Sequence, residues 1–203
     1  MRLFITPGSP YARMARITVL EKGLENEVEI VPARTRLASS PYYATNPSGR
    51  VPYLLRDDGV GLEESTLICD WLDRLAGEPM FGAPPGAMAW EARRLEALAR
   101  SLLDGVSVWG REIARPAAEQ SPTVIRHEQD RAARMVELWE SEIGHAWMQG
   151  AFNLAQLTLG CALGMDARNP DFRWRTGHPD LSAWHDRIAA RPSFLATLPP
   201  EAR

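Results

Sequence analysis

The sequence predicts an α/β N-terminal domain of residues 1–76 and an all-α C-terminal domain of residues 87–203. Three observations lead to this prediction. Short β-rich runs alternate with helical patterns in the first half, long helical stripes fill the second half, and residues 77–86 between them are rich in glycine and proline. We therefore interpret residues 77–86 as a linker. On length alone, a chain of 203 residues can bury a core as one domain or as two small domains.

The N-terminal domain begins with a strand, a helix and a second strand. Residues 3–5 and 28–31 are short β-rich runs. In the helix between them, Ser9 occupies the N-cap and Pro10 the first helical position, and the helix ends at Gly23. The first elements are therefore β-α-β.

An unusual strand signal follows an irregular stretch of residues 32–46. The run from Val51 to Leu55 is β-rich, but it contains Pro52, which cannot donate to a ladder. Pro52 therefore belongs on an edge strand or at a distortion, and the backbone of Val51 is open to an extended peptide ligand. A cis Val51-Pro52 bond would turn this backbone toward the ligand. The alternative is an edge-strand proline without a ligand.

A hairpin and a helix complete the domain. Asp58-Gly59 is a hairpin turn signal, and after a short strand Ser65 is the expected N-cap of a helix that runs to about Leu75. Unpaired N–H groups and the positive dipole end of this helix suit a small carboxylate, and Glu64 could accept from an ammonium. An α-amino acid headgroup carries both charges; ordinary capping is the alternative for Ser65. The order β-α-β, then β-β-α, is that of a thioredoxin-like domain.

The C-terminal domain opens with two long amphipathic helices. The first covers about residues 87–114, with apolar side chains on one broad face, and the second is capped by Ser121-Pro122. Such apolar stripes form a core or a dimer surface far more often than a substrate site. They therefore predict how this domain packs, and we assign no catalytic role to these residues.

A buried helix lies in the middle of this domain. Residues 154–163 are apolar nearly all round, with Asn153 as N-cap and Gln156 closing a capping box. A final helix covers about residues 181–190, and the tail of residues 192–200 should pack back on the core.

Composition narrows the classes of function. A net charge of −3, with Lys22 as the only lysine, argues against a nucleic-acid surface. Cys69 and Cys161 each lack a nearby second cysteine, and the four histidines lack the spacing of a shared metal site, so we expect neither a disulfide framework nor a metal. We find no targeting segment and no run of about 20 apolar residues that could span a membrane. A cytoplasmic protein is expected.

Taken together, these segments resemble the cytosolic glutathione S-transferase family nearly end to end. The resemblance rests on Ser9-Pro10-Tyr11-Ala12-Arg13, on the run Asn46-Pro47-Ser48-Gly49-Arg50-Val51-Pro52, and on Glu64-Ser65. Residues 115–121 (RPAAEQS) and 160–164 (GCALG) further resemble a bacterial subgroup of largely uncharacterised members. The resemblance implies the glutathione transferase fold and a homodimer.

The resemblance also implies a set of glutathione contacts. Val51 would pair its backbone with the cysteinyl part of glutathione, beside a cis Pro52. Glu64 and Ser65 would hold the γ-glutamyl end. Arg50 could approach the other end of the tripeptide. Glutathione is then a co-substrate, with no further cofactor.

Ser9 stands where the family places its thiol-activating residue, which indicates the serine type. A thiol with a pKa of about 8.5 is about 3% thiolate at pH 7, and lowering this pKa by two units requires about 2.7 kcal/mol. A hydrogen bond to the charged sulfur supplies about 1.5–3 kcal/mol, and a helix N-terminus adds about 0.3–1 kcal/mol. Neither a metal nor a general base is needed. Tyr11, one step into the helix, is the competing hydroxyl donor.

The electrophile pocket is expected by resemblance between the domains. Tyr11, Trp109 and Arg111 are candidate lining residues, although Trp109 could equally be core packing. The sequence thus predicts a glutathione S-transferase that attacks a small hydrophobic electrophile. One alternative is a binding scaffold of the same fold that holds glutathione or a partner protein without turnover. Another is a glutathione-dependent isomerase, lyase or peroxidase.

Overall fold

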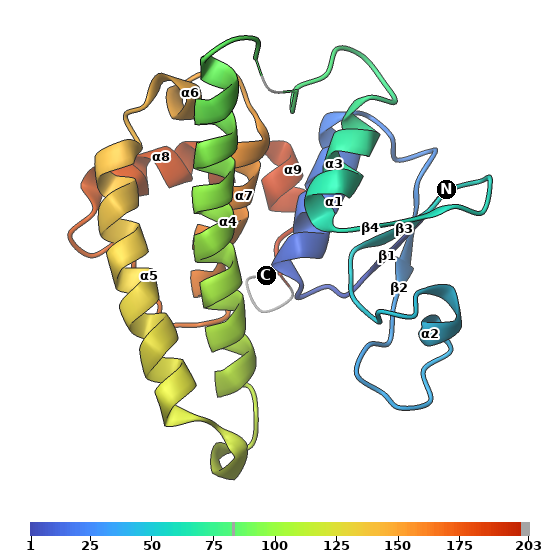
Figure 1. The fold of residues 1–203 in the computed structure, drawn as a ribbon, viewed down its shortest axis with the longest axis horizontal. Coiled ribbons are helices and arrows are strands. Elements are labelled where there is room, and N and C mark those ends of the chain that lie inside the picture. The colour runs from blue at the N-terminus through green and yellow to red at the C-terminus, as the bar shows by residue number, and fades with distance from the viewer. Residues whose placement is uncertain (83, 200–203) are drawn as a thin grey trace. The chain divides into compact units, whose positions relative to one another are not determined.

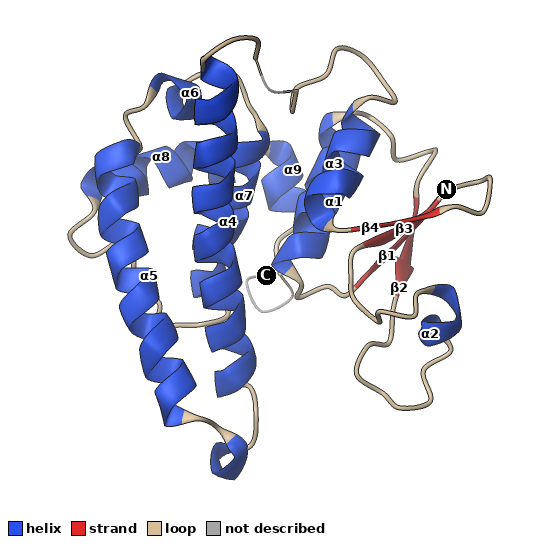
Figure 2. Ribbon diagram, in the orientation of Figure 1, coloured by secondary structure: helices blue, strands red, loops and turns tan. Residues whose placement is uncertain are grey.

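A computed structural model describes residues 1–82 and 84–199. It confirms the predicted fold class, with an α/β part followed by an all-helical part (Figures 1 and 2). By contacts, the described residues fall into two units: residues 1–82 with 196–199 form the first, and residues 84–195 form the second. Ala83 of the predicted linker, and Pro200 onward in the predicted tail, lie outside the described residues.

A mixed four-stranded sheet organises the first unit, and every strand of the described residues lies in this unit (Figure 2). Its order is β2-β1-β3-β4, with β2 parallel to β1 and the other two pairs antiparallel. The strands are β1 (Arg2–Ile5), β2 (Glu29–Pro32), β3 (Tyr53–Leu55) and β4 (Gly61–Glu63).

Helices cover both faces of this sheet. Helices α1 (Pro10–Glu21) and α3 (Ser65–Asp73) pack side by side on one face (Figure 1). The short helix α2 (Tyr42–Thr45) packs on the other, where the Tyr42 and Phe4 rings lie 5.5 Å apart. Side chains along a strand point alternately to the two faces of the sheet, so neighbouring residues of β1 face helices on opposite sides.

The stretch of residues 32–46, predicted to be irregular, contains α2. A single helical turn is too short to show a helical period in the sequence. Side-chain hydrogen bonds just before it fix its start: the Ser40 hydroxyl accepts from the Tyr42 backbone N–H at 3.3 Å and donates to the Arg34 carbonyl.

The single lysine ties α1 to the end of α3 and to the segment beyond it. Lys22 Nζ lies 3.2 Å from Asp73 Oδ1 and donates to the Glu78 carbonyl at 2.9 Å. The Asp73 carboxylate also accepts from the backbone N–H groups of Met80, at 2.9 Å, and Phe81, at 2.8 Å. The side chains of Lys22 and Asp73 are only 4% and 0% exposed, so this pair is a buried ion pair.

The second unit is built on two long helices, α4 (Met88–Ile113) and α5 (Pro122–Glu142), which run side by side (Figure 1). Helix α7 (Leu154–Leu163) packs on α4, and the described residues after Leu154 in α7 are all buried, as the apolar run predicts. The remaining elements are η1 (Ala117–Glu119), α6 (Ala146–Gln149), η2 (Gly164–Ala167), α8 (Pro179–Ala189) and α9 (Pro192–Ala196).

The capping box predicted at α7 is only half present. Asn153 Oδ1 accepts from the Gln156 backbone N–H at 3.1 Å, so Asn153 is the N-cap. The Gln156 side chain does not return to Asn153; its Nε2 donates to the Met148 carbonyl at 3.0 Å. Among the described residues no hydrogen bond joins Gln156 Oε1 to the Asn153 backbone N–H, so the predicted second half of the box is wrong; the amide is oriented instead by carbonyls around the end of α6, to which its Nε2 donates.

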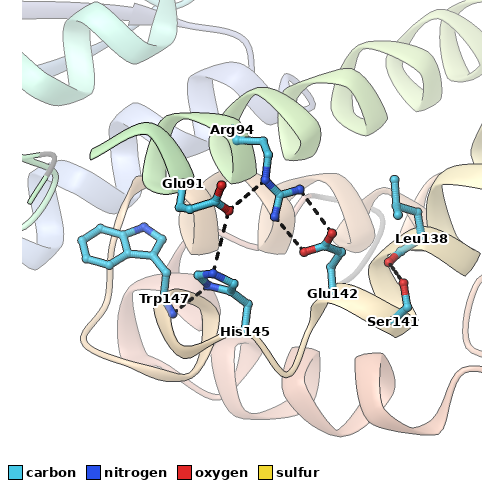
Figure 3. Close-up of polar contacts among 7 residues, drawn as sticks. All are labelled: Glu91, Arg94, Leu138, Ser141, Glu142, His145 and Trp147. Carbon is cyan, nitrogen blue, oxygen red and sulfur yellow. Dashed lines mark hydrogen bonds and ion pairs between the residues drawn. The ribbon is translucent and has the colours of Figure 1, made fainter. Parts of the chain in front are cut away.

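A charged cluster joins α4 to the end of α5 (Figure 3). Arg94 donates from Nε to Glu91 at 2.9 Å and, through both terminal nitrogens, to Glu142 at 3.2 and 2.9 Å. His145 lies 3.9 Å from Glu91 through Nε2, while its Nδ1 accepts from the Trp147 backbone N–H (Figure 3). The hydrogen bonds from Arg94 lower the pKa of Glu142.

We expect Glu142→Gln to destabilise the protein at pH 7 by less than about 1 kcal/mol, because the pair is partly exposed. The folded pKa of Glu142 is lowered, so its contribution is present above the ordinary pKa of 4.5 and is lost as the pH falls through the folded pKa. Urea titrations of wild type and variant at pH 7 and at pH 3 measure the loss of unfolding free energy at each pH. Equal destabilisation at the two pH values would contradict the charge assignment; Asp130→Asn, from a pair open to solvent, is the control.

The chain end contributes to both units. Phe194 of α9 packs edge-to-face on Phe152 in the second unit, at 6.2 Å between ring centroids. In the first unit, Arg13 Nε donates to the Thr197 hydroxyl at 3.4 Å. Arg13 is 6% and Thr197 1% exposed, so the tail covers part of α1.

Candidate functional site

The sheet register brings three predicted site segments to the same end of three neighbouring strands in the first unit. Phe4 of β1 pairs with Tyr53 of β3, which pairs with Glu63 of β4. Beyond this row, β1 continues toward Ser9, β3 is preceded by Val51-Pro52, and β4 is followed by Glu64-Ser65. Neighbouring strands lie about 4.8 Å apart, so the three segments lie within reach of one small ligand.

Ser9 occupies the N-cap of α1, as predicted. Its Oγ accepts from the Ala12 backbone N–H at 3.2 Å, and Pro10 is the first helical residue. In this hydrogen bond the Ser9 oxygen is the acceptor. A hydroxyl can also donate its own proton, so the same side chain could donate to a ligand. The side chain is partly exposed at the positive end of the α1 dipole, so it can donate to an anion there.

The Val51-Pro52 bond is cis, one of the two arrangements considered from the sequence. Of the two positions expected for Pro52, an edge strand or a distortion, the structure excludes the edge strand, because β3 pairs with β1 on one side and β4 on the other. Proline is accommodated because the ladder begins only at Tyr53. Val51 therefore lies outside the registered pairs of the sheet, half-buried, where its backbone can meet a ligand.

Glu64, rather than Ser65, is the N-cap of α3. Ser65 is the first helical residue and is 2% exposed, whereas Glu64 adopts a positive φ of 80°. This φ turns the Glu64 carboxylate back onto the helix, where it accepts from the backbone N–H groups of Thr66, at 2.9 Å, and Leu67, at 3.3 Å. The carboxylate also accepts from the Ser65 hydroxyl at 3.2 Å. The site thus has an exposed carboxylate beside a helix N-terminus.

Arg50 contributes through its backbone as well as its exposed side chain. Its carbonyl accepts from the Tyr42 hydroxyl and, at 3.0 Å, from Asn46 Nδ2. Sequence reasoning did not name Tyr42, and it quoted Asn46 only as part of the resemblance motif, without a role of its own. Nearby, a pocket of about 310 Å³ has a lining that includes Phe4, Arg34 and Tyr42 and none of the predicted glutathione-contact residues.

The three candidates for the electrophile pocket have different surroundings. Tyr11 is a half-buried residue at the start of α1, and Arg111 is exposed near the end of α4. Trp109 of α4 is 3% exposed and meets the Phe172 ring edge-to-face at 6.1 Å, within the core of the second unit. Its surroundings are those of a core residue, which was the alternative considered for it.

Other side chains of the described residues offer no metal site: no group of three His, Cys, Asp or Glu residues is placed to hold an ion. Cys69 and Cys161 are both buried thiols without a disulfide. None of the described helices combines the length and apolar character needed to cross a membrane.

Family models match both parts of the chain. The model for the glutathione S-transferase N-terminal domain covers residues 3–80, and that for the C-terminal domain covers residues 96–187. Among curated proteins, the chain is 28% identical to the uncharacterized GST-like protein YibF of Escherichia coli, over 100% of both chains. It is 34% identical to glutathione S-transferase 2 of Saccharomyces cerevisiae, over 98% of this chain and 89% of the yeast protein.

A solved structure supports the same relationship. A glutathione transferase family member from Pseudomonas fluorescens Pf-5, crystallised with bound glutathione, superposes with a TM-score of 0.88. It is 33% identical, over 98% of each chain. In another structure the Pseudomonas protein holds S-(propanoic acid)-glutathione, with a TM-score of 0.86.

Proposed function

Because the chain belongs to the glutathione S-transferase family, we propose that it is a serine-type glutathione transferase that conjugates glutathione to a small hydrophobic electrophile. The observation that carries this proposal is the row Phe4, Tyr53 and Glu63, beyond which the three site segments converge. The Pseudomonas relative, which binds glutathione, supports the same ligand for this chain.

Each segment has its own part in binding. Val51 pairs its backbone with the cysteinyl part of glutathione, beside Pro52. Glu64 and Ser65 hold the γ-glutamyl end, where the exposed Glu64 carboxylate accepts from the ammonium of the headgroup. Because this carboxylate already accepts from the Thr66 and Leu67 N–H groups, the N-terminus of α3 orients Glu64 rather than a second carboxylate. The exposed Arg50 guanidinium approaches the glycyl carboxylate at the other end.

Ser9 activates the thiol. Its hydroxyl donates to the glutathione sulfur, which favours the thiolate, and the α1 dipole acts in the same direction. The thiol proton passes to solvent, the thiolate forms a C–S bond with the electrophilic carbon, and the leaving group departs with the bonding electron pair. Ser9 thus holds the thiolate without itself taking a proton.

The second substrate is proposed to be a small electrophile with an anionic group. The Pseudomonas relative binds a glutathione thioether that carries a propanoic acid group, which supports a small electrophile with an anionic group. Within the first unit, the half-buried Tyr11 at the start of α1 is the proposed contact for it. Trp109, buried among helices, would act through packing.

Calorimetric titration with glutathione and with S-hexylglutathione tests this function. We expect dissociation constants between about 1 μM and 1 mM, as is usual for enzyme substrates, and tighter binding of the alkylated form, whose chain buries apolar surface. Conjugation of an activated aryl halide then separates a transferase from a scaffold. Binding without turnover of any electrophile would favour the scaffold; absence of heat with both ligands would contradict a glutathione site.

The active form is proposed to be a homodimer, as the family resemblance implies. Sedimentation equilibrium at micromolar concentrations measures the mass of the assembly. A single species of 22.6 kDa across this range would contradict the dimer.

A further inference from the structure

The Arg50 carbonyl is held by two side chains of the α2 segment. Its oxygen accepts from the Tyr42 hydroxyl and from Asn46 Nδ2, at 3.0 Å. Asn46 Nδ2 also donates to the Tyr42 hydroxyl oxygen at 3.2 Å, which closes a triangle of hydrogen bonds. Tyr42 is 6% and Asn46 1% exposed. We call these three groups the Arg50 clamp.

The clamp acts on the backbone that is proposed to meet glutathione. A peptide group is planar, so the Arg50 C=O and the Val51 N–H lie in one rigid unit and point in opposite directions. Holding the Arg50 oxygen therefore sets the direction of the Val51 N–H. Val51 lies outside the ladder, so the sheet does not provide this orientation.

We propose that Tyr42 and Asn46 are positioning residues for glutathione, which aim the Val51 N–H at the cysteinyl part of the tripeptide. This inference rests on the proposed function, because it assumes that Val51 is the docking strand. Neither side chain needs to touch glutathione. A bound extended peptide gains from a backbone donor that is already oriented, because less conformational freedom is lost on binding.

The clamp is distinct from the turn that carries Arg50. That turn has its own hydrogen bonds: the Gly49 N–H donates to the Asn46 carbonyl at 3.0 Å, and the Ser48 N–H donates to Asn46 Oδ1 at 3.1 Å. Removing the Tyr42 hydroxyl leaves these bonds and the Tyr42 ring packing on Phe4. Burial raises the pKa of Tyr42, so the phenol stays protonated and can donate at neutral pH.

Tyr42→Phe is therefore the selective variant, and Tyr43→Phe is its matched control. Tyr43 is the next residue of α2, its ring lies 6.4 Å from that of Tyr42, and no hydrogen bond is recorded for its hydroxyl among the described residues. Asn46→Asp provides a second test, because it keeps the acceptor for the Ser48 N–H but replaces the donor to Arg50 by a carboxylate.

The first measurement needs no ligand. The backbone order parameter of the Val51 N–H is expected near 0.85 in wild type and Tyr43→Phe, and clearly lower in Tyr42→Phe and Asn46→Asp. The second is glutathione titration with steady-state kinetics. We expect Tyr42→Phe to weaken binding about 3- to 10-fold, the effect of one neutral hydrogen bond, and to raise KM with kcat within about twofold.

The outcomes separate this inference from the proposed function. Unchanged Val51 order and unchanged glutathione affinity in Tyr42→Phe would overturn the clamp, as would equal losses in Tyr42→Phe and Tyr43→Phe. If wild type bound no glutathione, the proposed function would fail. The order parameters would then still decide whether Tyr42 and Asn46 orient Val51, while their role in positioning glutathione would be overturned.

Discussion

Replacing Ser9 by alanine is expected to lower kcat/KM for glutathione conjugation about 10- to 150-fold. The variant loses the hydrogen bond to the thiolate, and a bond to a charged group contributes about 1.5–3 kcal/mol, with each 1.36 kcal/mol equal to a factor of ten. The pKa of bound glutathione should rise by about 1 to 2 units for the same reason. The pH profile of kcat/KM measures this rise, which a purely structural loss would not produce.

A matched variant separates catalysis from helix capping. Ser9 Oγ caps α1, so its removal also costs about 1 kcal/mol of stability. Ser121 caps α5 in the same way: its side chain accepts from the Val124 N–H at 3.3 Å, and Pro122 follows it. Ser121→Ala should lose similar stability and keep full turnover. If Ser9→Ala stayed active while Tyr11→Phe abolished turnover, Tyr11 would be the thiol-activating residue.

Replacing Asp73 by alanine is expected to lower the free energy of unfolding by about 3–5 kcal/mol. This is the usual effect of removing one partner from a buried ion pair, since the other charge stays buried without compensation. Here the loss leaves the Lys22 ammonium without its carboxylate, and the backbone N–H groups of Met80 and Phe81 without their acceptor. Urea titration followed by circular dichroism measures the change.

Asp70→Ala is the control on the same helix. Asp70 pairs with Arg74 at 2.9 Å, but both side chains are well exposed, at 41% and 59%. An exposed pair contributes at most about 1 kcal/mol, so this variant should remain close to wild type. Similar stability losses in Asp73→Ala and Asp70→Ala would show that burial does not strengthen the Lys22 pair.

Local signals in the sequence predicted much of the fold. The Ser-Pro pairs at Ser9 and Ser121 predicted two helix starts, and the structure has N-caps at both positions. The fully apolar run of residues 154–163 predicted the buried α7. These signals work because caps and hydrophobic periods depend on residues within one or two turns of each other.

The sequence was less informative wherever a side chain had several possible partners. Ser65 was expected to cap α3, but Glu64 caps it, since a positive φ at a non-glycine residue has no clear signature in one sequence. Gln156 was expected to close a capping box, but its amide donates to carbonyls of α6. In both cases a nearby competing partner decided the outcome.

The amino-acid sequence by itself determined the order of the strands and of the longer helices, the family and the segments that meet at the candidate site. The tertiary structure alone decided which groups outside the regular elements pair: Tyr42 with the Arg50 carbonyl eight residues on, Lys22 with Asp73, and Arg13 with Thr197, which is 184 residues away. Local propensity acts over a few residues, whereas these contacts form only when folding closes the chain between the two partners. The Arg50 clamp is therefore visible in the fold and absent from the sequence pattern.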